Sequence, residues 1–499
     1  MMKDKLIGRN FILRNLKEEG IGTIEVLVSL MVIVTAITAV ILVVAGSQDV
    51  KVDNDISNTA LYRAGEIIGK TRTASEVSFN SVVSSSSVND IFNDGLKVSD
   101  ISPCRKDIVA SVSWSVRPDR SQNISLTTSL VSAEEAAALG EDCELNPPQQ
   151  DEWLIECPPQ YGFDLNPAGL AASGIDLIRR DLNKYIVLTS NKGSDEKHDF
   201  WIIDVTDKTS INLTSSINIG PNSNDVDAFG NFAFVVNNDV TDQLVVVNIS
   251  DLANPVAVAS TSLVGVDPAG SFPEGREVFY YNDRVYIGTR ETAGPEFHIF
   301  DVYDPANPVH LGSREINHTI HQIIVRGNYA YLATSSNRDE LIILDVSSPA
   351  SILPVFPGVG NPESFHFDAP GDIDGQSLYL LGNKLYLGRA RGTGTYHDFL
   401  VLDISDPSSV VLLGSTILNL NPGTGVKGTI ISGNLAFVVT SDQNSGFKIL
   451  NVANPSNITE VDSCNYSEKA IDIDFDGQYS YVANESNDAL RVINSISNP

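Results

Sequence analysis

The sequence has 499 residues, of which 42% are hydrophobic, so it is long enough for two or three domains with a large core. It is strongly acidic, with 63 Asp and Glu against 33 Lys and Arg and a formal net charge of −30 at pH 7. Such a charge repels polyanions, which excludes nucleic acid as a partner. No two of its four cysteines have Cys-x-x-Cys spacing, which disfavours zinc and redox motifs but permits disulfides outside the cytoplasm.

A polar leader with an excess of Lys and Arg occupies residues 1–20, and an apolar segment follows at 21–46. From Val26 to Gly46 there are 21 consecutive residues without a charge. A helix of that length spans roughly 30 Å, the hydrocarbon core of a bilayer. The basic leader predicts a cytoplasmic N-terminus, with the chain after Gly46 outside. Glu25 lies just inside the apolar run, where a carboxylate is costly without a partner.

At these residues the chain resembles a type IV prepilin or pseudopilin. Gly20 ends the leader, Ile21 holds the place of the methylated first residue, and Glu25 is the fifth residue after the cut. The resemblance implies cleavage by prepilin peptidase, N-methylation of Ile21, and pairing of Glu25 with the N-terminal amine of a neighbouring pilin subunit. It implies the cytoplasmic membrane before assembly, then the pilus at the cell surface. A signal peptide cleaved near 45–47 and a plain membrane anchor are the alternatives.

Residues 47–131 are predicted to form a small α+β head, as in pilins. Apolar residues continue at helical spacing to about Thr73, and two alternating segments, 108–116 and 123–128, predict strands of a half-buried antiparallel sheet. Trp114 lies in strict alternation, so we expect it in the core. The segment 132–173 is rich in proline and acidic residues near its middle, which predicts a linker out of the head.

From about Gly174 to Pro499 the chain repeats a unit of about 45 residues. An apolar run that ends in Asp or Asn recurs, and four strand signals in each of seven units predict a β-propeller. The segment from Asp301 to Pro308 resembles the consensus of bacterial surface propellers named after the sequence Leu-Val-Ile-Val-Asp. This resemblance indicates the fold and leaves the function open. The recurring Asp or Asn is at positions 204, 248, 301, 345, 403, 451 and 494.

The seventh unit ends after its third strand, so its outer strand must come from upstream, and Trp153–Cys157 is the candidate. The four cysteines allow three connectivities. We favour a bond between Cys157 and Cys464, which would attach this strand near the last units. That choice leaves Cys104 to pair with Cys143.

Two candidate sites lie in the repeats. Asp472, Asp474 and Asp476 have the spacing of a calcium loop, but Ala483 stands where such a loop needs Glu, so a strand with acidic side chains is the competing interpretation. Long connections between units emerge on one face together with the second-to-third strand loops, and loops of this kind commonly carry function. The candidate binding residues on that face are Phe272, Arg290, Phe365, His366, Phe367, Arg389, Arg391, Tyr396 and His397.

The sequence therefore predicts an N-terminal transmembrane and amphipathic helix with a small α+β pilin head, followed by an all-β, seven-bladed propeller at 174–499. We expect a minor pilin-like subunit that displays the propeller as an adhesion or recognition head for a glycan or protein. One alternative is a filament- or membrane-tethered enzyme acting on polysaccharide, although no catalytic motif is found. Another is a pseudopilin of a type II-like secretion system. No cofactor is expected apart from the calcium alternative.

Overall fold

The structure is a computed structural model of the chain, and its regular elements are mostly strands in eight sheets. One sheet is formed by strands near the N-terminus, and the other seven are formed by strands between residues 161 and 494. The residues that the structure describes are 31, 33–35, 37–38, 56–57, 59–75, 79, 82–89, 91–102, 104–117, 120–132, 153–166, 170–180, 183–191, 197–220, 222–239, 241–265, 274–355, 366–367, 369–371, 373–392, 395–465 and 468–495.

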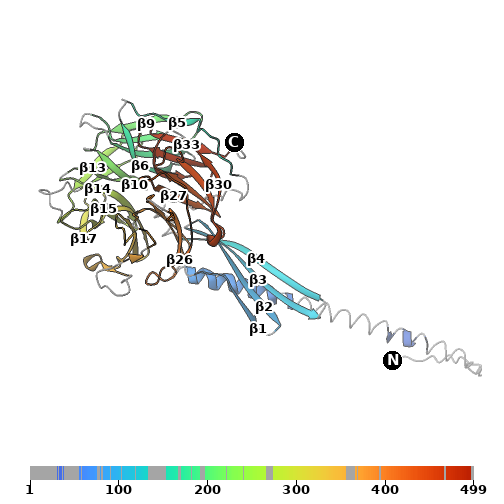
Figure 1. Ribbon diagram of the computed structural model, residues 1–499. Helices are drawn as coiled ribbons and strands as arrows, with labels where there is room; N and C mark the ends of the chain where they lie inside the picture. Colours follow the sequence, from blue (N-terminus) through green and yellow to red (C-terminus); the bar gives the residue numbers. More distant parts are fainter. Residues whose placement is uncertain are drawn as a thin grey trace, which may run out of the picture. The chain divides into compact units, whose positions relative to one another are not determined.

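The N-terminal sheet has four strands in chain order, accompanied by a helix at 59–75. Ala60 and Ala64 of this helix are fully buried in one apolar cluster with Phe92 and Trp114. Small side chains at this four-residue spacing form a stripe that lets the helix pack closely on the sheet. The strands are β1 (Ser85–Asn89), β2 (Phe92–Ser102), β3 (Arg105–Arg117) and β4 (Arg120–Val131) (Figure 1).

The predicted fold class is wrong in its helical part. Among the described residues, no helix is both long enough and apolar enough to cross a membrane. The helix at 59–75 carries charged side chains such as Arg63, whose Nη2 lies 2.5 Å from Asp94 Oδ2, and it packs on a sheet instead. The localisation predicted from a membrane helix is wrong on the same finding. The predicted segment at 21–46 lies outside the described residues, apart from single positions between Met31 and Thr38.

The seven other sheets form a closed ring, which confirms the predicted β-propeller. Each sheet is one blade, and the first strand of each blade lies beside the first strand of the next. The ring closes because β31 lies beside β6. The first strands are β6 (Ala171–Arg180), β10 (Ser223–Phe229), β14 (Gly275–Tyr281), β18 (Ile320–Arg326), β23 (Gly375–Leu381), β27 (Val426–Ser432) and β31 (Ala470–Phe475).

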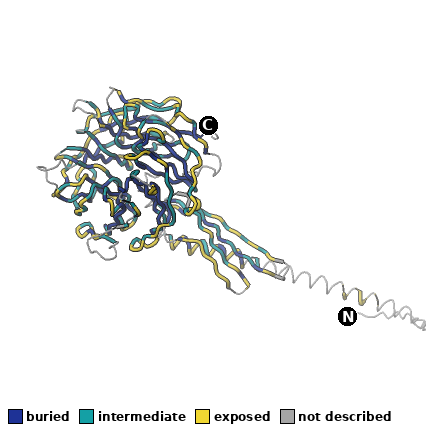
Figure 2. Tube along the Cα trace, viewed as in Figure 1, coloured by how far each residue is buried: buried dark blue, intermediate teal, exposed yellow. Residues whose placement is uncertain are grey.

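The second strands are buried almost throughout, because both of their faces pack against neighbouring blades. Each apolar cluster of the ring combines side chains from two adjacent blades, so the core lies between blades. In Figure 2, buried residues fill the interior of the propeller, and exposed residues lie mainly at its outside. The second strands are β7 (Asn183–Asn191), β11 (Phe232–Asn237), β15 (Arg284–Thr289), β19 (Tyr329–Thr334), β24 (Lys384–Arg389), β28 (Leu435–Thr440) and β32 (Tyr479–Asn484).

The third strands contain the recurring apolar runs that end in Asp or Asn. The terminal side chain makes a turn: Asp301 Oδ1 accepts a hydrogen bond from the Tyr303 N–H at 2.9 Å, and Asp345 Oδ1 accepts one from Ser347 N–H at the same distance. Asp and Asn suit this position because their short side chains can bond to the backbone two residues on. The third strands are β8 (Phe200–Asp204), β12 (Leu244–Asn248), β16 (Phe297–Asp301), β20 (Leu341–Asp345), β25 (Phe399–Asp403), β29 (Phe447–Asn451) and β33 (Leu490–Asn494).

The fourth strands form the exposed rim of the ring. In one blade this strand is split into two short pieces that both pair with β20. Two 3-10 helices, η2 (Pro349–Ser351) and η3 (Pro455–Asn457), precede β21 and β30. The fourth strands are β9 (Asn212–Ile217), β13 (Val256–Thr261), β17 (Val309–Arg314), β21 (Leu353–Pro354) with β22 (His366–Phe367), β26 (Val411–Thr416), β30 (Thr459–Cys464) and β5 (Tyr161–Phe163).

The last blade takes its fourth strand from before the first blade. β5 pairs with β33, with Tyr161 opposite Val492 and Phe163 opposite Leu490. Gly162 is required at the centre of β5, because a Cβ there would lie 2.4 Å from the Leu490 carbonyl oxygen. The closing strand is therefore Tyr161–Phe163 rather than the expected Trp153–Cys157.

The expected segment is attached to the last two blades in another way. Ile155 forms a single bridge with Ser495, and the Trp153 ring packs edge-on at 4.9 Å from the Phe437 ring. A disulfide joins Cys157 to Cys464 on β30. Cys104 is also disulfide-bonded, and Cys143 lies outside the described residues.

Candidate functional site at the channel mouth

Every first strand of the propeller contains one extra residue near its start. In β10, for example, Ser223 pairs with Asn237 and Asp225 with Val236, which leaves Asn224 as the extra residue of a β-bulge. A bulge turns its extra side chain out of the alternation of the strand, and bulges are common beside functional sites. We term the seven extra residues the bulge ring: Ser173, Asn224, Arg276, His321, Gln376, Lys427 and Ile471.

All seven residues of the bulge ring line one cavity of about 370 Å³. Successive strands of a blade run antiparallel, so the start of the first strand lies at the same end as the second-to-third strand loop and the connection from the previous blade. We term this end of the propeller the loop face. The cavity is therefore the mouth of the central channel on the loop face.

The mouth contains positive side chains in a chain that is otherwise acidic. Lys427 Nζ donates a hydrogen bond to Gln376 Oε1 at 2.5 Å. Burial, followed by repulsion from Arg276, lowers the pKa of Lys427. Burial, followed by repulsion from Lys427 and Arg276, lowers the pKa of His321 to about 3, so its ring is neutral at physiological pH.

A layer of carboxyl groups lies below the bulge ring. Each accepts a hydrogen bond from the backbone of the next blade: Asp225 Oδ2 from the Val278 N–H at 2.9 Å, and Asp472 Oδ2 from the Ile175 N–H at 3.2 Å. Glu277 occupies the same position in β14 and lies in the same cavity. These side chains supply acceptors to first strands whose channel edge has no further strand to pair with.

A second layer of side chains lies two residues further along each first strand. One part of this layer is acidic and the other part is apolar. Asp176 and Asp227 accept N–H bonds from the next blade, each at 2.6 Å. Asp474 does the same at 2.8 Å. The other blades place apolar side chains such as Ile324 and Ile430 at this level, and both parts line a cavity of about 240 Å³.

Burial makes these carboxyl groups unusually weak acids. It raises the pKa of Asp225 and Asp227 to about 7 in each case, against backbone hydrogen bonds that lower it. Burial, then repulsion between neighbouring carboxylates, holds the pKa of Asp176 and Glu277 well above the ordinary range. Asp472 is raised in pKa in the same way, with Asp225 as the repelling neighbour. Asp225 and Asp227 are therefore partly protonated near neutral pH.

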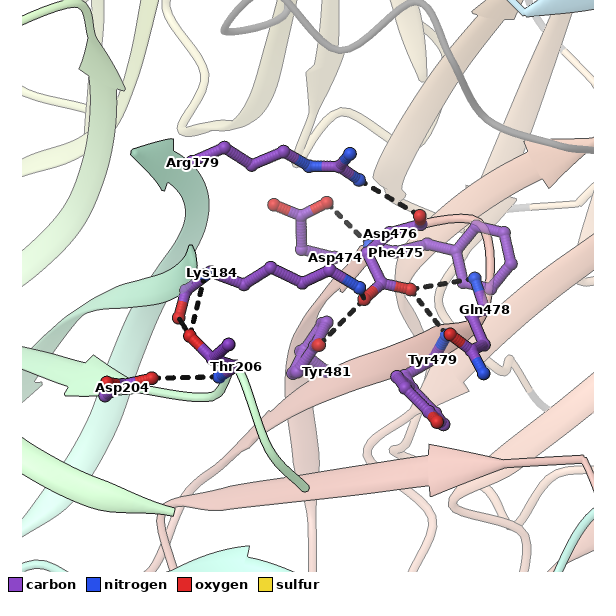
Figure 3. A network of polar contacts seen from close by, with 10 residues as sticks. All are labelled: Arg179, Lys184, Asp204, Thr206, Asp474, Phe475, Asp476, Gln478, Tyr479 and Tyr481. Atoms are coloured by element: carbon purple, nitrogen blue, oxygen red, sulfur yellow. Dashed lines mark hydrogen bonds and ion pairs between the residues drawn. The ribbon is translucent and has the colours of Figure 1, made fainter. Parts of the chain in front are cut away.

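The residues of the calcium alternative lie where the last blade meets the first. Asp472 and Asp474 lie on strand β31, and their carboxylates bond to the first blade. Asp476 follows β31 and accepts hydrogen bonds from Lys184 Nζ and from the Tyr481 hydroxyl, the latter at 2.9 Å (Figure 3). The three acids thus join the last blade to the first. In the part of the chain that the structure describes, no group of three or more His, Cys, Asp or Glu side chains is arranged to hold a metal ion.

The structure places those predicted binding residues that it describes in different surroundings. Arg389 is 1% exposed and pairs with buried Glu340, Nη2 to Oε1 at 2.5 Å, so it holds the core together rather than facing a ligand. His366 and Phe367 form β22 and pair with β20, which places them in the split fourth strand of a blade. Phe272 and Phe365 lie outside the described residues.

The remaining predicted residues lie in loops of the loop face and do not line the channel-mouth cavity, although Arg290 shares Glu274 with Arg276 of the bulge ring. Arg391 Nη1 lies 3.2 Å from Asp398 Oδ1, and Arg290 is exposed beside Glu274 at 3.6 Å. Tyr396 is 41% exposed, and His397 Nδ1 lies 2.5 Å from Ser415 Oγ. Arg389, Tyr396 and His397 share a groove of about 210 Å³.

Sequence reasoning missed the bulge ring. Its members differ from blade to blade, so no repeated letter marks them. The available signal was their place, because each stands two residues before a buried apolar or Thr residue of its first strand. Asn224, for example, precedes Val226, and Lys427 precedes Thr429.

The fold and the repeats define a β-propeller repeat protein. Four segments of the chain match the LVIVD repeat, at residues 220–262, 320–356, 393–417 and 426–466. No curated protein sequence matches the chain.

Many solved structures resemble the propeller in fold, at low sequence identity. A computationally designed protein, Ika8, has 11% identity and a TM-score of 0.44, covering 67% of this chain and 99% of its own. The β-propeller domain of Cps50 (Swd1) from Myceliophteria thermophila has 10% identity and a TM-score of 0.41, covering 70% and 98%. A catalytically inactive virginiamycin B lyase from Staphylococcus aureus with quinupristin has 13% identity and a TM-score of 0.45, covering 67% and 98%.

Proposed function

We propose that this protein is a subunit of a type IV pilus-like filament and that its propeller is a recognition head. The filament role is supported by the residues that resemble a prepilin cleavage site, Gly20 and Ile21, and by Glu25 as the contact to other subunits. Prepilin peptidase is the processing partner under this proposal.

The observation that carries the recognition role is the channel mouth. A chain with a net charge of −30 places Arg276 and Lys427 together in a recessed cavity of about 370 Å³. Cavities of this size suit small ligands or the terminal unit of a larger one. The cavity opens on the loop face, where insertions between blades change the shape of the surface without disturbing the strands.

Two measurements test this proposal. Intact mass spectrometry of the native protein should give a chain that begins at methylated Ile21, and a Glu25→Ala variant should enter filaments less well than the parent chain. A native chain that begins at Met1, or normal assembly of the variant, would refute the filament role. Glycan-array binding by the full chain tests the recognition role, and a chain that binds no glycan contradicts it.

A second candidate, an enzyme acting on polysaccharide, is favoured by one observation. Asp225 and Asp227 have pKa values near 7 inside the channel, and carboxyl groups tuned in this way serve as general acids in glycosidases. Both groups also hold the next blade by hydrogen bonds, so they have a structural role as well. Release of reducing ends from a bound polysaccharide, abolished by Asp227→Asn, would establish the enzyme.

A further inference from the structure

Of the two cations of the bulge ring, Lys427 lacks a close carboxylate and Arg276 shares one with Arg290. Lys427 has no ion-pair partner within 4.0 Å among the described residues, and Glu485, the acid that most favours its charge, pairs with Lys469 at 3.4 Å. The closest carboxylate paired with Arg276 is Glu274, at 3.8 Å. A largely buried ammonium group without a counter-ion is costly, and a bound anion would offset that cost.

The strand order places uncharged groups between these cations. Arg276 belongs to β14 and Lys427 to β27, with β18 and β23 between them in the ring. The bulge residues of those two strands are His321, whose ring is neutral, and Gln376, whose amide carries N–H donors. A ligand carboxylate bound at this side of the cavity would have a positive side chain, Arg276 or Lys427, on either side of it. The uncharged side chains of His321 and Gln376 would lie between the two.

The rest of the ring suits hydroxyl groups. On the far side of the cavity, the Ser173 hydroxyl donates to the Ser223 carbonyl and the Asn224 amide N–H group donates to the Gly275 carbonyl, each at 2.5 Å. The oxygen atoms of both side chains can accept hydrogen bonds from ligand hydroxyls.

The floor below is formed by Asp225, Glu277 and Asp472. The pKa of Asp225 is about 7, so this acid is largely neutral near pH 6, and burial raises the pKa of the other two well above their ordinary values. Neutral carboxyl groups donate hydrogen bonds and do not repel an anion.

We propose that the bulge ring binds a carboxylated sugar, with Arg276 and Lys427 holding the carboxylate and the neutral polar residues holding the ring hydroxyls. This inference rests on the proposed recognition function and specifies its ligand as the uronic-acid type of unit in an acidic polysaccharide. The cavity of about 370 Å³ accommodates one sugar ring.

Calorimetric titration of the full chain at pH 6 tests the inference with three probes: glucuronate, glucose and acetate. Glucuronate should bind at least tenfold more tightly than either of the others, because glucose lacks the charge and acetate lacks the hydroxyls. Lys427→Met should weaken glucuronate binding about tenfold or more, since a charged hydrogen bond is lost. The same variant should be at least as stable as the parent chain to heat, because it removes a buried charge.

Lys384→Met is the matched control, since it removes a half-buried lysine at the opposite end of the blades, where β24 starts. It should leave glucuronate binding unchanged. Equal binding of acetate and glucuronate, or undiminished binding by Lys427→Met, would overturn the ligand assignment. Binding of neutral glycans alone would overturn this inference but leave the recognition role intact, and glucuronate binding by a chain that never enters filaments would overturn only the filament role.

Discussion

Replacing Asp227 by Asn should change how the stability of the propeller depends on pH. Asp227 is buried in the channel, and its Oδ2 accepts the Tyr280 N–H at 2.6 Å. Asn keeps an oxygen acceptor in this place but carries no charge at any pH. At the equivalent position one layer up, Gln322 Oε1 already accepts the Leu378 N–H from the next blade, so an amide is a workable substitute within this fold.

The size of the effect follows from the pKa of Asp227, which burial raises from 3.8 to about 7. The folded chain therefore holds this proton more tightly than the unfolded chain does. The resulting stabilisation is fully present below the unfolded pKa and is lost as the pH rises through about 7. The shift from 3.8 to about 7 corresponds to a loss of at most about 4.5 kcal/mol, at about 1.4 kcal/mol per pKa unit. Coupling to the other channel acids reduces what one substitution recovers to about 2–4 kcal/mol.

Urea unfolding at pH 5, 6, 7 and 8 measures this difference. Both chains should carry Trp114→Phe, so that fluorescence reports on Trp153 and Trp201, which are buried in the propeller. The parent chain should lose stability as the pH rises, and Asp227→Asn should lose less. The reasoning is refuted if the two chains show the same pH dependence, or if the parent chain becomes more stable toward pH 8.

Asp406→Asn is the matched control for this experiment. Asp406 lies in an exposed turn, where hydrogen bonds from the Ser408 hydroxyl and N–H lower its pKa. It therefore titrates below the tested range, and its replacement should leave the pH dependence between 5 and 8 unchanged.

Two further substitutions test the closure and the core of the ring. Trp153→Ala should cost about 3–5 kcal/mol of unfolding free energy in urea, because the ring is 5% exposed and packs on Phe437, whereas Leu154→Ala beside it, 48% exposed, should change little. Equal effects would mean that this segment does not hold the last blades. Arg389→Ala should also cost about 3–5 kcal/mol by leaving Glu340 buried without its partner, and adding Glu340→Gln should recover part of the loss. If Arg389→Ala folds normally but abolishes glycan binding, Arg389 is a ligand contact after all.

The sequence predicted those parts of the propeller that repeat within a short stretch of chain. The third strand is recognisable because its apolar run and its final Asp or Asn satisfy purely local needs, burial on both faces and a turn two residues later. The missing strand of the seventh unit could be inferred by counting strand signals, because this unit ends after its third strand. Which residues supply it could not, because the choice between Trp153–Cys157 and Tyr161–Phe163 depends on pairing with β33, more than 300 residues away in the chain.

The candidate site was harder to predict because its determinants are not local. Arg389 and Arg391 are two residues apart and equivalent in the sequence, yet the first is buried by an ion pair with Glu340 and the second lies beside Asp398 in a loop. The bulge at Asn224 becomes visible only when β10 is aligned with β11, since one extra residue leaves the local pattern nearly unchanged. His366 belongs to a split strand for a similar reason, because its partner on β20 is Ile342.

The channel acids bear on where function lies in this molecule. A first strand needs an acceptor on the preceding blade, and the amide of Gln322 meets that need without a charge. Asp225 and Asp227 meet it at a cost, since their pKa values show that burial opposes their ionised forms. Ring closure alone therefore does not account for the acids, and carboxyl groups perturbed in this way are concentrated at functional sites. Both acids lie on β10 below Asn224 of the bulge ring, and Asp225 lines the same cavity as Arg276 and Lys427. The channel mouth, rather than the outer loops, therefore has the stronger physical claim to be the functional centre.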